Sequence, residues 1–298
     1  RPSTDEQKWA TFKNVEIRIP ARPELQVRIP KGYFLNSPTP PATAQNSEPA
    51  AKPAESVVDT DLKRALSASS LETNVPTTVA LTYVDTPDNG PLATASVQVA
   101  AAVLEYGPDP KQAAVDVAGV ILNDAGKAAA SFRTRLTVNP ISSQPGSDNG
   151  GVIYNYKAKL TPGIYQVRTA VRDEKSGRVG SAAQWIEIPD LSSKKLTLSS
   201  LLLRPIRKGA AGPTTEAPFS VDHHFPKTSQ LNFFVFIYNA SRNITGTPNP
   251  NLTAQVEVFR NGKSIVSTPA RMLATTGMTD LQRIPYGGQF PLESLPGG

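Results

Sequence analysis

The sequence of 298 residues contains no cysteine, two histidines and two tryptophans. Without cysteine the chain has no disulfide, no thiolate metal site and no cysteine nucleophile, although this absence does not settle its compartment. No stretch approaches the roughly 18 consecutive apolar residues that a membrane-spanning helix needs. We therefore expect a chain without a membrane span, held together by apolar packing and hydrogen bonds.

A strong charge of one sign is also missing, because 31 Lys and Arg stand against 25 Asp and Glu, a net charge of +6. No run of Lys and Arg interleaved with aromatic residues occurs, so a nucleic acid is not an expected partner. The mild positive balance is compatible with an anionic cell surface or polysaccharide. Ordinary surface charge is the simpler interpretation.

The two histidines, His223 and His224, are adjacent and follow Asp222. Neighbouring residues of a strand point to opposite faces, so the pair is poorly placed to share one metal ion. A solvated loop before a strand is the simpler interpretation. No G-x-S-x-G motif and no glycine-rich phosphate loop occurs, so an enzyme is not expected.

Two acidic clusters have the residue types that ligate Ca²⁺, namely Asp85, Asp88 and Asn89, and separately Asp148 and Asn149. Neither cluster has the spacing of an EF-hand loop. Asp, Asn and Gly are also the residues that turns use. We therefore predict no catalytic, cofactor-binding or metal-binding residue, and no cofactor.

The best-patterned stretch runs from Leu160 to Leu191. Residues 164–172 alternate apolar and polar side chains after the turn residues Pro162 and Gly163, and residues 179–188 form the return strand. The tip between them holds Asp173 and Glu174, flanked by Arg172 and Arg178, and a charged hairpin tip is the simplest account of these four residues.

The rest of the chain divides into four segments. Residues 1–35 predict a two-strand segment, 36–58 a Pro/Ala-rich linker, 59–190 a β-sandwich with a short leading helix, and 191–298 a second β-sandwich. We predict first-sandwich strands at 75–84, 93–106, 115–122, 129–138 and 154–160, followed by the hairpin. In the second we predict strands at 196–203, 230–239, 252–260, 263–268 and 289–295, with Asn261-Gly262 as a type I′ turn.

The predicted fold class is therefore all-β, with tandem immunoglobulin-like β-sandwiches. Leu295-Pro296-Gly297 corresponds to the Leu-Thr-Pro-Gly that precedes the last hairpin of the first sandwich, so we predict a divergent repeat whose second copy lacks its last two strands. The chain opens on Arg1 and we expect it to be processed or partial. Strands supplied from elsewhere, or by a partner through strand addition, are the two ways to complete the second copy.

Several of these motifs resemble a known family. The stretches PGIYQVRTAVRD, SGRVGSA and IPDL within residues 162–191, with KGYF at 31–34, are similar to the C-terminal part of Acidobacteria-type von Willebrand factor type A domain-related proteins. The resemblance implies immunoglobulin-like β modules and a location that is secreted, periplasmic or on the surface of a bacterium. The type A domain itself is absent from this chain, and no DxSxS metal-adhesion motif occurs, so Mg²⁺-dependent binding is not implied.

Two functions follow from this pattern. The first is a non-catalytic envelope or extracellular scaffold or adhesion protein that contacts protein partners through exposed strand edges, with self-assembly into an oligomer or filament as its sharper form. The alternative is a polysaccharide- or ligand-binding module that uses loops and exposed aromatic residues such as Trp9 and Trp185, although Trp185 on a strand is more often a core residue. Three glycosylation sequons, at Asn239, Asn243 and Asn251, indicate an exposed loop and mean little in a bacterium.

Overall fold

The computed structural model describes residues 56–88, 90–140, 151–207, 219–240 and 250–297, together with the backbone of two short strands near the N-terminus. Those strands, β1 (Phe12–Asn14) and β2 (Gly32–Phe34), pair antiparallel with each other. The rest of the predicted two-strand segment, the linker at 36–55 and the loop at 141–150 lie outside the described residues. The chain is mostly β-strand in several antiparallel sheets with one short helix, which confirms the all-β prediction, while its immunoglobulin-like tandem form stays a prediction.

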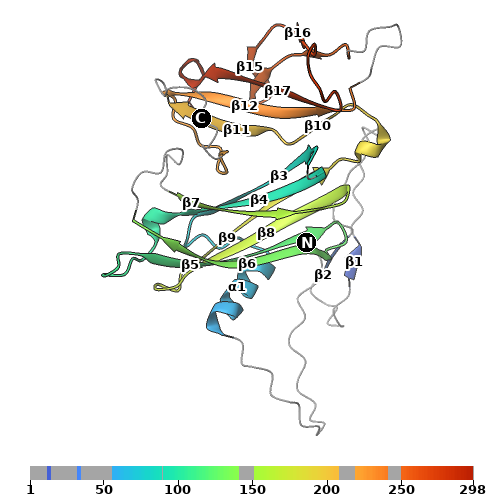
Figure 1. Ribbon diagram of the computed structural model, residues 1–298. Helices are drawn as coiled ribbons and strands as arrows, with labels where there is room; N and C mark the ends of the chain where they lie inside the picture. Colours follow the sequence, from blue (N-terminus) through green and yellow to red (C-terminus); the bar gives the residue numbers. More distant parts are fainter. Residues whose placement is uncertain are drawn as a thin grey trace.

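The first β unit is built from two antiparallel sheets that lie face to face (Figure 1). One has the order β3-β4-β7 and consists of β3 (Thr77–Thr86), β4 (Gly90–Ala100) and β7 (Gly151–Ala158). The other has the order β6-β5-β8-β9 and consists of β5 (Ala113–Asn123), β6 (Ala128–Val138), β8 (Gly163–Asp173) and β9 (Val179–Ile188). Their inner faces share one apolar core, in which Val97, Val117 and Val167 are fully buried.

The predicted hairpin of residues 160–191 is β8 and β9, which pair from Gly163–Ile188 to Arg172–Val179. The alternation in the sequence places Tyr165, Val167 and Val171 in the core. This prediction is confirmed, because a period of two with one apolar face can bury only that face.

The leading helix, α1 (Val57–Ser67), covers the outer face of the four-stranded sheet (Figure 1). Ser56 caps it by accepting a hydrogen bond from the Asp59 N–H. Leu62 and Ala65 pack on apolar residues of β5, β8 and β9, and Arg172 binds Asp61 at 2.9 Å. The short helix expected against the first sandwich is therefore present.

The second β unit has one antiparallel sheet around β12 (Ser229–Tyr238), the most hydrophobic strand of the sequence. β10 (Thr197–Leu198) and β11 (Leu202–Arg207) follow each other along one edge of β12, and β17 (Arg283–Pro291) lies along the other. Two small ribbons pair β13 (Thr253–Ala254) with β16 (Arg271–Met272), and β14 (Glu257–Arg260) with β15 (Lys263–Ser267).

Several predicted strand limits in the two units need correction. The strand at 196–203 is interrupted after Leu198, because the backbone turns there to hydrogen-bond the first unit. The strand at 93–106 ends at Ala100 and continues as the 3₁₀ turn η1 (Ala101–Val103). β17 starts at Arg283, earlier than predicted, and two further 3₁₀ turns are η2 (Leu191–Ser193) and η3 (Leu292–Ser294).

The Asn-Gly turn between β14 and β15 is confirmed. Asn261 has φ 51° and Gly262 has φ 75°, the two positive values that a type I′ turn requires. The strand before it is shorter than predicted, because residues 253–254 pair separately with β16.

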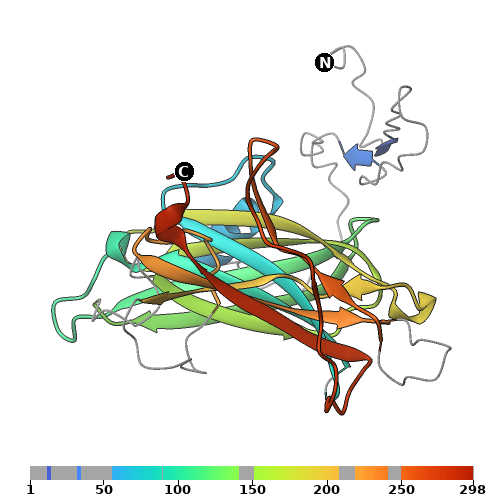
Figure 2. The same ribbon diagram turned by 90° about the horizontal axis from the view of Figure 1, so that it is seen from above.

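The elements stack in layers, which Figure 1 shows edge-on and Figure 2 from above. α1 is outermost on one side, followed by the four-stranded sheet, the three-stranded sheet and the sheet around β12, with the ribbons beyond it. Within the described ranges, no helix is long and apolar enough to cross a membrane.

Candidate functional site

The two β units are joined by a tyrosine that leaves one sheet and enters the core of the other. Tyr238, the last residue of β12, is 1% exposed and belongs to the core of the first unit. Its hydroxyl accepts a hydrogen bond from the Asp85 N–H at 2.7 Å, and its ring lies edge-on to Tyr83 at 6.5 Å. The end of β12 is thereby fixed to the end of β3.

Backbone and ionic contacts reinforce this joint. The Tyr83 N–H donates to the Ser200 Oγ at 2.8 Å, and the Ser200 N–H donates to the Tyr83 carbonyl at 3.0 Å. Arg283, the first residue of β17, binds the buried Asp85 carboxylate at 3.3 Å. We call this set the joint: Tyr83, Asp85, Ser200, Tyr238 and Arg283.

A further contact lies away from the joint, where the Gln98 side-chain amide on β4 donates to an Asp222 carboxylate oxygen at 3.1 Å. Two separate points of attachment restrict rotation of one unit against the other. The joint also changes side-chain chemistry. Burial, with a smaller contribution from the Asp85 charge, raises the pKa of Tyr83 to about 12, and burial also raises the pKa of Tyr238.

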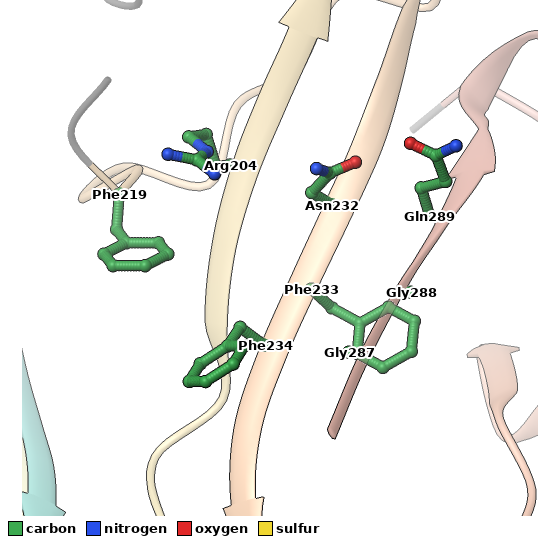
Figure 3. Close-up of a pocket in the computed structure, with 8 residues that line it drawn as sticks. All are labelled: Arg204, Phe219, Asn232, Phe233, Phe234, Gly287, Gly288 and Gln289. Atoms are coloured by element: carbon green, nitrogen blue, oxygen red, sulfur yellow. The ribbon is translucent and has the colours of Figure 1, made fainter. Parts of the chain in front are cut away.

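A groove of about 450 Å³ lies on the sheet of the second unit (Figure 3). The strand register places Arg204 of β11 beside Asn232 of β12, and Asn232 beside Gln289 of β17. These three polar side chains form a row across the sheet, as Figure 3 shows. The next row on the same face contains Phe234 and Gly287.

Two adjacent glycines of β17, Gly287 and Gly288, line the groove, and Phe233 packs closely against both. A Cβ atom added to Gly287 would lie 2.8 Å from the Phe233 carbonyl oxygen, and one added to Gly288 would lie 2.9 Å from the Phe233 ring. Both positions therefore favour glycine.

The chemistry of the groove combines one cation, two amides and phenyl rings. The Arg204 guanidinium lies 5.6 Å from the centre of the Phe219 ring, which is 41% exposed. The Oδ1 atom of Asn232 is buried and has no hydrogen-bond partner among the described residues. A buried polar atom without a partner costs about 1–3 kcal/mol, so the amide marks the position where a ligand group would be stabilised.

Strand edges are the other surface that the sequence singled out. In the described part of the chain, the end strands of the first unit are β3, β6, β7 and β9, and those of the second are β17 on one side and β10 and β11 on the other. The β3 edge is hydrogen-bonded by Ser200 and Tyr238 of the second unit. β17 contains Pro285 and Pro291, and β6 carries Arg133 and Arg135. Prolines and charged side chains on an edge strand both discourage the addition of another strand. β7 has no proline and a single charged residue, Lys157.

The residues considered as metal ligands are engaged in other contacts. Asp222 accepts hydrogen bonds from the Gln98 amide and from the His224 N–H, while the Nδ1 atom of His224 lies 2.9 Å from the Asp222 carbonyl oxygen. His223 and His224 are both exposed. No group of three or more His, Asp or Glu suited to a metal ion occurs in the ranges that the structure describes.

Of the residues considered as Ca²⁺ ligands, the structure describes Asp85 and Asp88. Asp85 belongs to the joint, Asp88 is exposed, and Asn89, Asp148 and Asn149 lie outside the described residues. The acidic pair at the hairpin tip has structural contacts. The fully buried Asp173 accepts hydrogen bonds from the Glu105 N–H at 3.0 Å and the Ser176 hydroxyl at 2.6 Å, and Glu174 binds Arg135.

Among the remaining sequence candidates, those that the structure describes do not line the groove. Trp185 is on β9 and is 44% exposed, so the expectation that it is a core residue is wrong. The Asn239 amide donates to the carbonyl oxygens of Leu191 and Lys195, so the side chain of this sequon is engaged in hydrogen bonds to the backbone. Asn251 is exposed, while Asn243 and Trp9 are not described.

No family model matches the chain, and a search of curated proteins finds no match. The resemblance to von Willebrand factor type A-related proteins therefore stays a prediction. The groove was not predicted from the sequence, although the sequence contains two signals of it: a polar Asn232 inside an apolar strand, and the Gly287-Gly288 pair inside another.

Proposed function

We propose that the chain is a non-catalytic scaffold of the cell envelope or extracellular space that associates with protein, in the first place a second copy of itself, by strand addition. The observation that supports this most is the edge of β7. It is eight residues long, and its inward side chains Tyr154 and Tyr156 are held against Phe132, with ring centres 5.7 and 4.7 Å apart. An ordered, weakly charged edge strand presents free N–H and C=O groups to another strand.

The joint supports the same proposal. A scaffold holds its partners at a fixed distance only if its own units do not rotate against each other. The joint and the Gln98–Asp222 contact both restrict that rotation. Pairing of β7 with β7 of a second copy about a two-fold axis gives a closed dimer, whereas pairing with a different edge gives an open filament. The dimer is favoured because it pairs β7 with β7, the edge without proline and with a single charged residue, and does not use the protected edges of β6 or β17.

Light scattering of the full chain over a range of concentrations tests this function. We expect the mass to rise from 31.8 kDa towards twice that value. The double variant Ile153→Lys/Asn155→Lys places like charges opposite each other in a β7–β7 pair and should stay monomeric. Ser69→Lys/Ser70→Lys adds the same charge at exposed positions of the first unit outside β7 and should still dimerise. A monomer at every concentration would exclude self-association.

A second candidate function, a ligand-binding module, is favoured by the groove. It has a volume typical of small-molecule sites, apolar rings, and a few polar groups that point into one space. A fragment screen followed by nuclear magnetic resonance tests it: shifts confined to groove residues support a binding module, and no such shift with any fragment excludes it.

A further inference from the structure

We propose that the groove of the second unit binds a neutral saccharide chain, through the side-chain amides of Asn232 and Gln289 and the phenyl ring of Phe219. This inference rests on the second candidate function, because it names the class of ligand that such a module would bind. It is independent of the β7 edge, which lies in the other unit.

The buried amide is the first reason. A primary amide can be rotated by 180°, so the inward atom of Asn232 is either the acceptor oxygen or the donor NH₂ group. A ligand hydroxyl satisfies both cases because it donates and accepts, whereas a carboxylate only accepts and an ammonium group only donates. A group with several adjacent hydroxyls therefore fits the Asn232–Gln289 row best.

The second reason is the apolar part of the groove. Phe219 is 41% exposed, with Arg204 over one face of its ring, and Phe234 also lines the groove (Figure 3). Sugar rings have a C–H face that packs on phenyl rings by dispersion and exclusion of water. Hydroxyls at the sugar's rim would then reach the amide row, which runs beside the phenyl rings on the same sheet face.

Two of the three polar side chains in the groove carry no charge, which is compatible with a neutral ligand. Arg204 is the one charged residue among the eight that line it, and its guanidinium already lies over Phe219. Recognition then depends on the two amides, which carry no charge. All eight residues come from the second unit, so the groove is a furrow on a sheet and suits a chain better than a single enclosed ring.

Titration of the full chain with neutral oligosaccharides tests the inference, using gluco-, xylo- and chito-oligosaccharides as separate probes and calorimetry as the readout. We expect at least one series to bind at millimolar concentration or tighter. Asn232→Leu should weaken that binding about ten-fold, the loss typical of one buried hydrogen bond. Gln230→Leu is the matched control, because it makes a similar polar-to-apolar change on the same face of β12 outside the groove and should bind like the wild type.

Two variants at exposed positions keep the test decisive if Asn232→Leu fails to fold. Phe219→Ala and Gln289→Ala should each weaken binding several-fold without changing the melting temperature by more than about 2 °C. The inference is overturned if no neutral series binds, if all three groove variants bind like the wild type, or if an unstructured peptide binds in place of the saccharides. If fragments other than saccharides then shift the resonances of groove residues, the saccharide proposal fails but the ligand-binding function stands. If no fragment shifts them, both the saccharide proposal and the ligand-binding function fail.

Discussion

The joint makes a quantitative prediction about a single hydroxyl. Tyr238→Phe keeps the ring in the first unit's core but removes the oxygen that accepts from the Asp85 N–H at 2.7 Å. Asp85 is buried, so its N–H loses its partner without gaining water. Leaving a buried donor unsatisfied costs about 1–3 kcal/mol, and we expect the free energy of unfolding to fall by that amount.

Urea unfolding followed by tryptophan fluorescence measures this loss, together with a melting temperature expected to fall by about 2–4 °C per kcal/mol for a chain of this size. Tyr286→Phe is the matched control. Tyr286 lies in the same sheet and packs against Phe233, and no described residue hydrogen-bonds its hydroxyl. We expect this control to change stability by less than about 0.5 kcal/mol.

A larger change at the same position should also uncouple the units. Tyr238→Ala removes a ring that is 1% exposed and should cost about 3–5 kcal/mol, with unfolding in two steps in place of one. The reasoning would be refuted by a Tyr238→Phe protein as stable as the wild type, because the joint would then contribute nothing through this hydroxyl.

Three further predictions concern the first unit and its joint. Because the pKa of Tyr83 is raised to about 12, the folded chain keeps the phenol proton between pH 10 and 12, where the unfolded chain loses it. The free energy of unfolding should therefore fall by about 2–3 kcal/mol as the pH rises from 10 to 12, which urea unfolding measures. Asp173→Ala should cost about 2–4 kcal/mol, because the Glu105 N–H and the Ser176 hydroxyl lose a buried charged acceptor, and exchange of the Glu105 amide should accelerate. Leu62→Ala should cost about 2–5 kcal/mol, seen as early loss of helical circular dichroism, because its side chain is buried against the sheet.

Each of these three has a control in the chain. Tyr83→Phe should remove the part of the alkaline loss that comes from Tyr83 and leave the part that comes from Tyr238. Asp85→Asn should lower the pKa of Tyr83 by removing a nearby negative charge. Glu174→Ala at an exposed ion pair should cost less than about 1 kcal/mol, and Lys63→Ala on the exposed face of α1 less than about 0.5 kcal/mol. Equal effects of a test variant and its control would contradict the assigned contacts.

Most of the strands and turns could be predicted from local patterns in the sequence. The hairpin of residues 160–191, the Asn261-Gly262 turn and the central strand at 230–239 could all be predicted, because period-two alternation and turn chemistry act within a few residues. The errors arose where a distant segment determines the local backbone. The strand at 196–203 is broken because Ser200 pairs with Tyr83, a contact 117 residues apart in sequence.

The candidate site was harder to predict for the same reason. Arg204, Asn232 and Gln289 share a row only through the register of three strands, and no local pattern contains that register. Phe219 contributes from a segment between two of those strands. Asp85, a residue type that can also ligate Ca²⁺, instead binds Arg283 across the joint.

The most direct test of the proposed scaffold is disulfide cross-linking along β7. The natural chain has no cysteine, so single cysteines at Ile153, Asn155 and Lys157 report only on contacts between copies. Strand addition brings paired Cα atoms to about 4.5–5.5 Å, within disulfide reach. We predict rapid formation of a covalent dimer in one register along β7, from one variant alone or from a mixed pair, and none from a Gln289→Cys control on β17. Cross-linking no faster at β7 than at that control would contradict association through this edge.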